Sequence, residues 1–387
     1  MIRIPTYKEH RKRKEIFDRY LYMMALILPF SPKDIIGDDV IEVDGEIIDA
    51  GNFLEKSGKL PRKRSLNYRR TLKGYGIRKS TSDKEECFAQ DQLLAAKIIA
   101  KASQELYKYL YYVKNNSRYI KKAPVMNREN LRILLTIKMD ELIPVLENIP
   151  KIQEKEHQEN LLRYVFCYDK FSRDKKVIKL FMDMDVPVCP YCNRQYTFTV
   201  SEENGSSRPQ FDHYLSKSEY PYFAVSLLNL VPSCGLCNQS KGDKAPKVLY
   251  PYSDEMGENV LFRTRTKTGF NYLLGDRNAR DEFEVILEPV NNELTDEFLK
   301  KLDNSKKYFH LVKLYDGHKD YILHLFRKKY VFNDDYLESL CQQFPDMFSD
   351  KNDIKHLMYL MEIEKEHWGR RTLSKLTHDI DLEMRDN

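Results

Sequence analysis

The sequence predicts an α+β fold that is mostly helical, in which a small, loop-rich module of short strands lies between helical flanking regions. Apolar residues recur at helical spacing over 127–148, which predicts one helix there. From about 186 to 252, proline, cysteine, glycine and short aromatic runs replace that pattern, and after Asn292 the chain returns to helices. A chain of 387 residues is long enough for two or three domains and at least one sizeable core.

Composition divides the chain into four segments. They are a charged N-terminal segment with a β-hairpin and a basic arm (1–84), a helical region (85–185), the loop-rich module (186–252), and a strand-containing connector followed by a helical C-terminal region (253–387). The hairpin is expected because alternating apolar residues over 40–48 surround the turn signal Asp44-Gly45. Residues 283–287 alternate as well, which predicts a strand in the connector.

The net charge of +5 is mildly basic and by itself supports a nucleic-acid partner only weakly. The charge is uneven, because 56–79 holds ten Lys or Arg residues and no acidic residue. This stretch is either a solvated loop or an arm that contacts phosphates and releases their counterions. The arm hypothesis assigns nucleic-acid contacts to Arg62, Lys63, Arg64, Arg69 and Arg70.

No apolar run approaches the 18 residues that a membrane-spanning helix requires. The most apolar stretch, 20–30, is too short to cross a bilayer and lacks the small-residue cleavage site of a secretory signal. We therefore expect a protein that does not associate with a membrane and that is located in the cytoplasm.

Four of the seven cysteines form two C-x-x-C pairs, Cys189 with Cys192 and Cys234 with Cys237. Each pair can place two thiolates on one tight turn, and two such turns complete a tetrahedral, structural zinc site. The alternative for a single pair is a redox-active dithiol. Two pairs within one small, loop-rich segment favour zinc.

Asp212-His213 and then Asn229 lie between the two cysteine pairs, and Asn238 follows the last cysteine directly. In order and spacing, this set resembles the HNH nucleases, the zinc-stapled branch of the ββα-metal superfamily. The resemblance covers 189–244. It implies a ββα-metal fold for the module, a structural zinc ion, a catalytic Mg²⁺ or Mn²⁺ ion and hydrolysis of phosphodiester bonds.

The residue types also suit this chemistry on their own. Phosphodiester hydrolysis needs a base for water, positive charge at the scissile phosphate and help for the leaving oxygen. His213 can be the base, because a neutral imidazole titrates near working pH. Asp212 offers a hard oxygen to Mg²⁺ or Mn²⁺. In a strand, however, neighbouring side chains point to opposite faces, so a bend at the strand end is needed to bring both residues to one site.

The resemblance implies further roles. Asn238 matches the second ligand of the catalytic metal, and this Asn replaces the final His of the family name. Asn229 matches a structural position whose side chain bonds the backbone across the loop and holds His213 in place. Lys241 and Lys244, one turn along the expected helix, either contact phosphate or are solvated helix lysines.

The leading prediction is a metal-dependent endonuclease that cuts DNA, with a role in bacterial defence against foreign DNA. A nuclease that cuts RNA is a second hypothesis, because phosphate contacts do not distinguish the sugar. A third is a non-catalytic zinc module that binds nucleic acid or a partner protein, although such a module needs no Asp-His-Asn-Asn set.

The flanks show only a general likeness to bacterial HNH proteins with helical flanks. Some of these, such as the nuclease partner in Septu-type anti-phage systems, work beside an ATPase. The chain contains no G-x-x-x-x-G-K-[ST] motif. An ATPase is therefore expected only as a separate partner protein.

Overall fold

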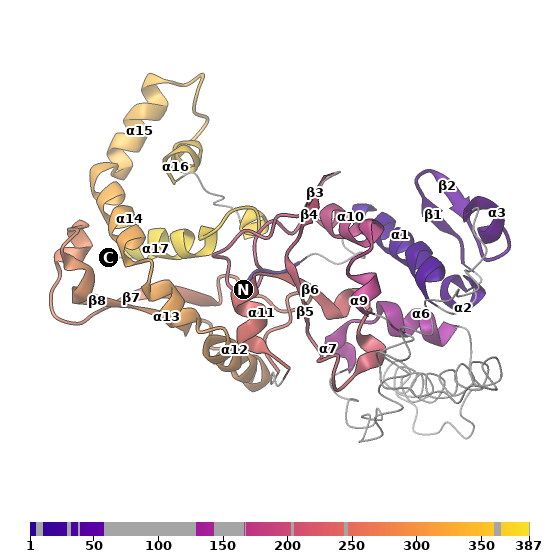
Figure 1. Cartoon of the computed structure of the whole chain (residues 1–387). Helices are drawn as coiled ribbons and strands as arrows, with labels where there is room; N and C mark the ends of the chain where they lie inside the picture. Colours follow the sequence, from indigo (N-terminus) through magenta and orange to yellow (C-terminus); the bar gives the residue numbers. More distant parts are fainter. Residues whose placement is uncertain are drawn as a thin grey trace.

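A computed structural model describes residues 1–4, 11–28, 32–37, 39–57, 129–142, 166, 168–202, 205–243, 247–359 and 365–386. These residues form a mixed α+β fold, as predicted, with helices and four two-stranded antiparallel sheets. In Figure 1 the short strands of the cysteine-containing module lie between the N-terminal helices on one side and a longer hairpin with the C-terminal helices on the other.

The N-terminal part contains the predicted hairpin. Helix α1 (Arg11–Ile27) and helix α2 (Pro32–Ile36) precede strands β1 (Ile41–Val43) and β2 (Glu46–Ile48), and α3 (Phe53–Ser57) follows. Asp44 and Gly45 in the turn have φ angles of 52° and 79°. Two positive φ angles are what a two-residue hairpin turn requires, and Asp-Gly tolerates them. The hairpin prediction is therefore confirmed.

The single helix predicted over 127–148 is wrong in its described part. The chain forms α6 (Glu129–Thr136) and a separate short helix, α7 (Met139–Leu142). At the break, the backbone N–H of Met139 donates to Tyr250 Oη over 3.3 Å. A tertiary contact thus takes the donor that a continuous helix would have used itself.

Two more short helices lead into the module. Helix α9 (Tyr168–Phe171) is separated from α10 (Lys175–Asp183) by a break. Asp174 ends this break as the N-cap of α10, where its side chain accepts from the N–H of Lys176 over 2.9 Å. The apolar face of α10 is buried, through Val177, Ile178, Leu180 and Phe181.

The module has the ββα order that the sequence predicts. Strands β3 (Val200–Glu202) and β4 (Gly205–Ser207) form a small hairpin. Strand β5 (Gln210–His213) pairs with β6 (Leu230–Ser233), with His213 opposite Leu230. Helix α11 (Gly235–Lys241) follows β6 directly. The connection from β5 to β6 contains two 3₁₀ turns, η2 (Pro221–Phe223) and η3 (Leu227–Asn229).

The C-terminal part begins with strands β7 (Val260–Thr266) and β8 (Phe283–Pro289), so the strand predicted over 283–287 is confirmed. Between them lie the 3₁₀ turns η4 (Asn271–Leu274) and η5 (Ala279–Glu282). The described residues after β8 form the helical elements α12 (Asp296–Tyr308), α13 (Leu311–Asp316), α14 (Lys319–Val331), α15 (Asp334–Gln343), α16 (Lys351–Tyr359), the 3₁₀ turn η6 (Lys365–His367) and α17 (Ser374–Asp386). Helix α17 packs on β7 and α14.

The C-terminal part is attached to the first cysteine turn. The Asn193 side chain donates to the carbonyl of Trp368 over 2.9 Å and accepts from the N–H of Lys375 over 3.2 Å. Tyr315 Oη donates to the carbonyl of Cys192 over 2.5 Å. These buried bonds join segments far apart in sequence, so the position of the cysteine turn depends on the whole C-terminal region.

Several predictions fall outside the described residues. The basic arm over 56–79, with Arg62, Lys63, Arg64, Arg69 and Arg70, lies there except for its first two residues, and so does Lys244. The four proposed segment boundaries stay predictions. Within the part of the chain that is described, no helix is long and apolar enough to cross a membrane.

Candidate metal centre and active site

The four paired cysteines meet in one buried cluster. Cys189 and Cys192 come from the turn after α10, Cys234 caps the N-terminus of α11, and Cys237 lies in its first turn. All four sulfur atoms lie within 4.8 Å of one another, and the Sγ atoms of Cys192 and Cys234 are 3.9 Å apart. A tetrahedral site with bonds of about 2.3 Å has sulfur–sulfur edges of about 3.8 Å. The cluster therefore fits a metal ion such as zinc.

The first cysteine turn owes its shape to backbone bonds. The Asn193 N–H donates to the carbonyl of Cys189 over 2.8 Å, and the Cys189 N–H donates to the carbonyl of Gln195 over 2.9 Å. Asn193 adopts a φ of 51°, a conformation that Asn tolerates better than most residues. Burial raises the pKa of the Cys189 thiol. Four thiolates in this place thus need a bound cation to offset their desolvation.

Tyr191, between the first two cysteines, connects the cluster to strand β5. Its ring stacks on Phe309, with centroids 4.4 Å apart, and its Oη donates to Asp212 Oδ2 over 2.6 Å. Burial raises the pKa of Tyr191 well above 10, so the hydroxyl stays a donor at working pH. The sequence analysis missed this contact, whose one signal was an aromatic residue inside a C-x-x-C turn.

Asp212 is paired with Lys241 inside the module. The Lys241 ammonium lies 3.0 Å from Asp212 Oδ1 and donates to the His213 carbonyl over 2.6 Å. Asp212 is 3% exposed and Lys241 is 4% exposed. Lys241 was expected to contact phosphate or to be solvated. The solvated alternative is wrong, because the charged end of Lys241 lies against a buried carboxylate, and the phosphate contact stays a prediction.

The two faces of β5 carry different residues. Gln210 and Asp212 face α11, and the Asn238 amide donates to Gln210 Oε1 over 2.7 Å. Phe211 packs against Phe181 of α10, with ring centroids 3.8 Å apart, on the other face. Figure 1 shows β5 between α11 and α9 accordingly.

His213 continues this alternation. It packs edge-on against Tyr168 of α9, with ring centroids 4.4 Å apart, on the face opposite Asp212. The strand pairing extends to His213 itself, opposite Leu230. The bend that was expected to turn Asp212 and His213 toward one site is therefore absent from this conformation, because the ladder holds the strand extended.

The environment of His213 specifies its protonation. His213 Nε2 lies 2.9 Å from the carbonyl oxygen of Ala224. A carbonyl only accepts, so Nε2 carries the proton and Nδ1 carries the lone pair. Burial lowers the pKa of His213 to about 3, below the value near working pH that the sequence predicted, so in this conformation the imidazole is neutral and is a weaker base than expected. A neutral ring with its proton fixed on Nε2 can accept a proton at Nδ1.

Asn229 holds the loop around His213. It is fully buried, its Oδ1 accepts from the N–H of Leu215 over 2.7 Å, and its Nδ2 donates to the carbonyls of Leu215 (3.1 Å) and Phe223 (2.9 Å). Leu215 lies two residues after His213, and Phe223 directly precedes Ala224. The side chain thus bonds the backbone across the loop, which is the geometry expected for it, and it supports the carbonyl that orients His213.

Asp212 and Asn238 offer oxygen donors from β5 and α11, a donor type that suits Mg²⁺ or Mn²⁺. Both oxygens of Asp212 are already engaged, one by the Tyr191 hydroxyl and the other by the Lys241 ammonium. In this arrangement the Lys241 ammonium occupies the position beside Asp212 that a metal cation would take. A divalent ion therefore does not fit at Asp212 unless Lys241 moves.

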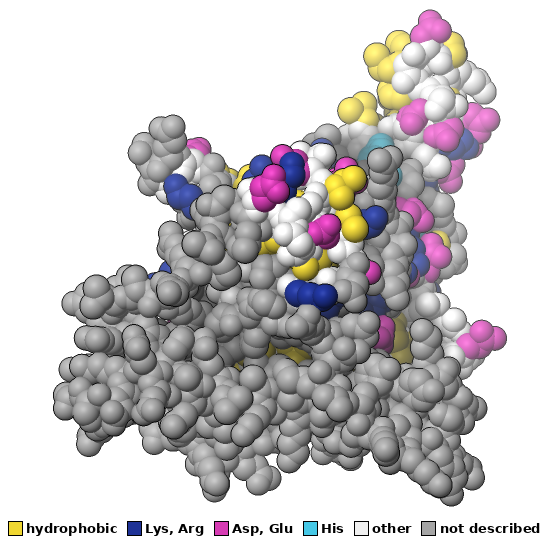
Figure 2. Space-filling model, turned by 90° about the vertical axis from the view of Figure 1, so that its right-hand side faces the viewer, with side chains coloured by type: hydrophobic (Ala, Val, Ile, Leu, Met, Phe, Trp, Pro, Cys, Tyr) yellow, Lys and Arg dark blue, Asp and Glu magenta, His cyan; other side chains and the backbone are white. Residues whose placement is uncertain are grey.

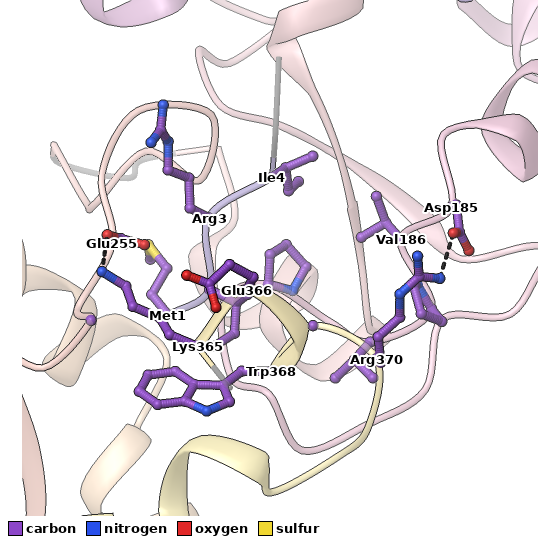
Figure 3. Close-up of a pocket in the computed structure, with 16 residues that line it drawn as sticks. Met1, Arg3, Ile4, Asp185, Val186, Glu255, Lys365, Glu366, Trp368 and Arg370 are labelled. Atoms are coloured by element: carbon purple, nitrogen blue, oxygen red, sulfur yellow. Dashed lines mark hydrogen bonds and ion pairs between the residues drawn. The ribbon is translucent and has the colours of Figure 1, made fainter. Parts of the chain in front are cut away.

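A cavity of about 390 Å³ lies on another side of the cysteine turn (Figure 3). Its lining includes residues 1–4, 185–188, 365–366 and 368–370. Ion pairs join Lys365 to Glu255 and Arg370 to Asp185 across its walls. None of Asp212, His213, Asn229 and Asn238 lines it. The cavity is thus separate from the candidate catalytic residues.

Fold and site together define a mixed α+β protein with a buried four-cysteine cluster beside a ββα unit. Protein ea31 of Escherichia phage lambda is 30% identical over 128 residues, which cover 31% of this chain and 36% of that protein. Septu protein PtuB of Bacillus thuringiensis is 29% identical over 121 residues, which cover 30% of this chain and 42% of that protein. The chain thus spans less than half the length of either relative. No family model matches the chain, and no solved structure matches it.

Proposed function

We propose that this protein is a metal-dependent nuclease of the HNH type that hydrolyses phosphodiester bonds of DNA, with a role in bacterial defence against foreign DNA. The observation that carries the proposal is His213, a neutral imidazole oriented by a carbonyl within a ββα unit beside a four-cysteine cluster. The similarity to Septu protein PtuB supports the defence role. An ATPase partner protein stays an expectation from the general likeness of the flanks to Septu-type nucleases.

In this proposal His213 Nδ1 takes the proton from the attacking water, and the carbonyl of Ala224 stabilises the charged ring that results. Asn229 maintains this orientation through its three bonds to the loop. Asp212 and Asn238 are the proposed ligands of Mg²⁺ or Mn²⁺, which would supply positive charge at the scissile phosphate. This last assignment requires Lys241 to leave Asp212, and the end of β5 to bend, because Asp212 and His213 lie on opposite faces of the strand in this conformation.

Nucleic-acid affinity is proposed to come mainly from outside the ββα unit. Among the described side chains on the face shown in Figure 2, basic and acidic groups are interspersed. The basic arm with Arg62, Lys63, Arg64, Arg69 and Arg70 stays the proposed phosphate-binding element, on the basis of its sequence.

The proposal is tested by incubating the purified protein with supercoiled plasmid and, separately, with total RNA, each with Mg²⁺, with Mn²⁺ and with EDTA. We expect nicking or cutting of the plasmid that depends on the divalent ion and stops in EDTA. Cleavage of RNA alone would favour the RNA-directed alternative. No cleavage of either substrate, with and without a candidate ATPase partner, would favour the non-catalytic zinc module.

Replacing Asn229 with alanine is expected to lower the cleavage rate without changing the metal concentration that gives half-maximal activity. The substitution removes three hydrogen bonds from buried backbone groups, at about 1 kcal/mol or more each, so the melting temperature also falls. Initial rates over a Mg²⁺ series measure the effect. A large shift of the Mg²⁺ midpoint would instead place Asn229 among the metal ligands.

A further inference from the structure

We propose that Lys241 is an internal counter-ion that competes with the divalent cation for Asp212, so that the site takes up metal only when the Lys241 ammonium leaves. The inference rests on the proposed function in one respect, the assignment of Asp212 as a metal ligand. It adds a regulated step to that site, namely an exchange of one cation for another.

The contacts of Lys241 are those of a bound cation. Its Nζ lies 3.0 Å from Asp212 Oδ1 and 2.6 Å from the His213 carbonyl, and 5.9 Å from the centroid of the Tyr214 ring. Two oxygen contacts and an aromatic ring thus surround the charge in a place closed to solvent. Tyr191 donates to the other carboxylate oxygen, so both oxygens of Asp212 are already engaged and Lys241 is the cation beside them.

Electrostatics makes the two cations exclusive. A divalent ion binds a carboxylate oxygen at about 2.0–2.1 Å, which brings it close to any ammonium on the same carboxylate. In a buried site the repulsion between such charges is weakly screened. The same ammonium stabilises the metal-free site. Without it, the Asp212 carboxylate would be buried with an uncompensated charge.

The position of Lys241 suits an exchange. It is the last residue of α11, and Gly242 ends the helix with a φ of 59°. The side chain therefore reaches Asp212 from the end of the helix rather than from its middle. Once displaced, its charge becomes available beside the site, where it can contact the phosphate that the sequence analysis assigned to it. One lysine thus has two successive anionic partners, Asp212 and the substrate.

The experiment measures Mn²⁺ binding to the full-length, zinc-loaded protein by electron paramagnetic resonance, without nucleic acid. We compare wild type with Lys241→Met, which removes the charge, and Lys241→Gln, which removes the charge but can still donate to Asp212. Lys241→Arg keeps the charge, and Lys313→Met on α13 is a matched control at an exposed lysine. If Lys241→Met does not fold, Lys241→Gln provides the neutral variant for the same measurement.

We expect either neutral variant to bind Mn²⁺ at least tenfold more tightly than wild type, and both control variants to bind as wild type does. Adding Asp212→Asn to Lys241→Gln is expected to abolish the gain. Unchanged or weaker Mn²⁺ binding in the neutral variants would overturn the proposal, and so would a gain that survives Asp212→Asn. The readout is independent of cleavage. A protein with the expected Mn²⁺ behaviour that cuts neither DNA nor RNA, with and without a candidate ATPase partner, would therefore refute the nuclease function and leave the exchange intact.

Discussion

Replacing His213 with alanine is expected to lower nucleic-acid cleavage by about 100-fold to 10,000-fold, the range that a general base contributes. The structure supplies the physical reason, since the ring is neutral and its Nε2 proton is fixed by the Ala224 carbonyl, which leaves Nδ1 as the acceptor. Initial rates of plasmid cleavage at saturating Mg²⁺ measure the effect.

His213 is partly buried, so the alanine variant also loses packing and leaves the Ala224 carbonyl without its donor. His213→Gln is therefore the more informative variant, because its amide can still donate to the Ala224 carbonyl but cannot serve as the base. His324→Ala, at an exposed position of α14, is the matched control and should cut as wild type does. A His213→Gln protein with normal zinc content and wild-type cleavage would refute the general-base assignment.

Replacing Cys234 with serine is expected to remove most of the bound zinc and to lower the free energy of unfolding by several kcal/mol. Metal binding is part of the folding free energy in such sites, and a serine hydroxyl is a poor substitute for a thiolate. The cluster joins the turn of Cys189 and Cys192 to the start of α11, so its loss releases the helix that carries Asn238 and Lys241.

Elemental analysis of the purified protein gives the zinc content, and thermal melts with and without a chelator give the stability. Wild type should hold about one zinc per chain, as a single four-thiolate site binds one ion. Cys341→Ser, on α15 and outside the cluster, is the control and should change neither quantity. A well-folded wild type with almost no zinc would contradict the structural-zinc assignment.

Features with a local cause were predictable from sequence. The hairpin at Asp44-Gly45 follows from turn residues that accept positive φ angles. The cysteine cluster follows from spacing, because each C-x-x-C turn already places two sulfur atoms side by side. The loop contacts of Asn229 were expected from the resemblance, which aligns this residue with a known structural position.

Features that depend on a contact with a distant segment of the chain were not predictable from sequence. The break between α6 and α7 depends on Tyr250, which lies more than a hundred residues later in the chain. The contact between Tyr191 and Asp212 joins a cysteine turn to a strand, and neither segment alone indicates it. Helical periodicity and motif spacing are local patterns in the sequence. They do not identify the distant segment that packs against a given helix or strand.

The sequence by itself determined the residue types of the site and their order: two cysteine pairs, Asp212-His213, Asn229 and Asn238. Only the tertiary structure decided how their side chains are used. Lys241 is a phosphate contact or a solvated lysine by sequence, yet packing of α11 on β5 buries it against Asp212. The physical reason is that a long charged side chain takes its role from the nearest opposite charge and the local access of water, and both depend on the elements that pack around it.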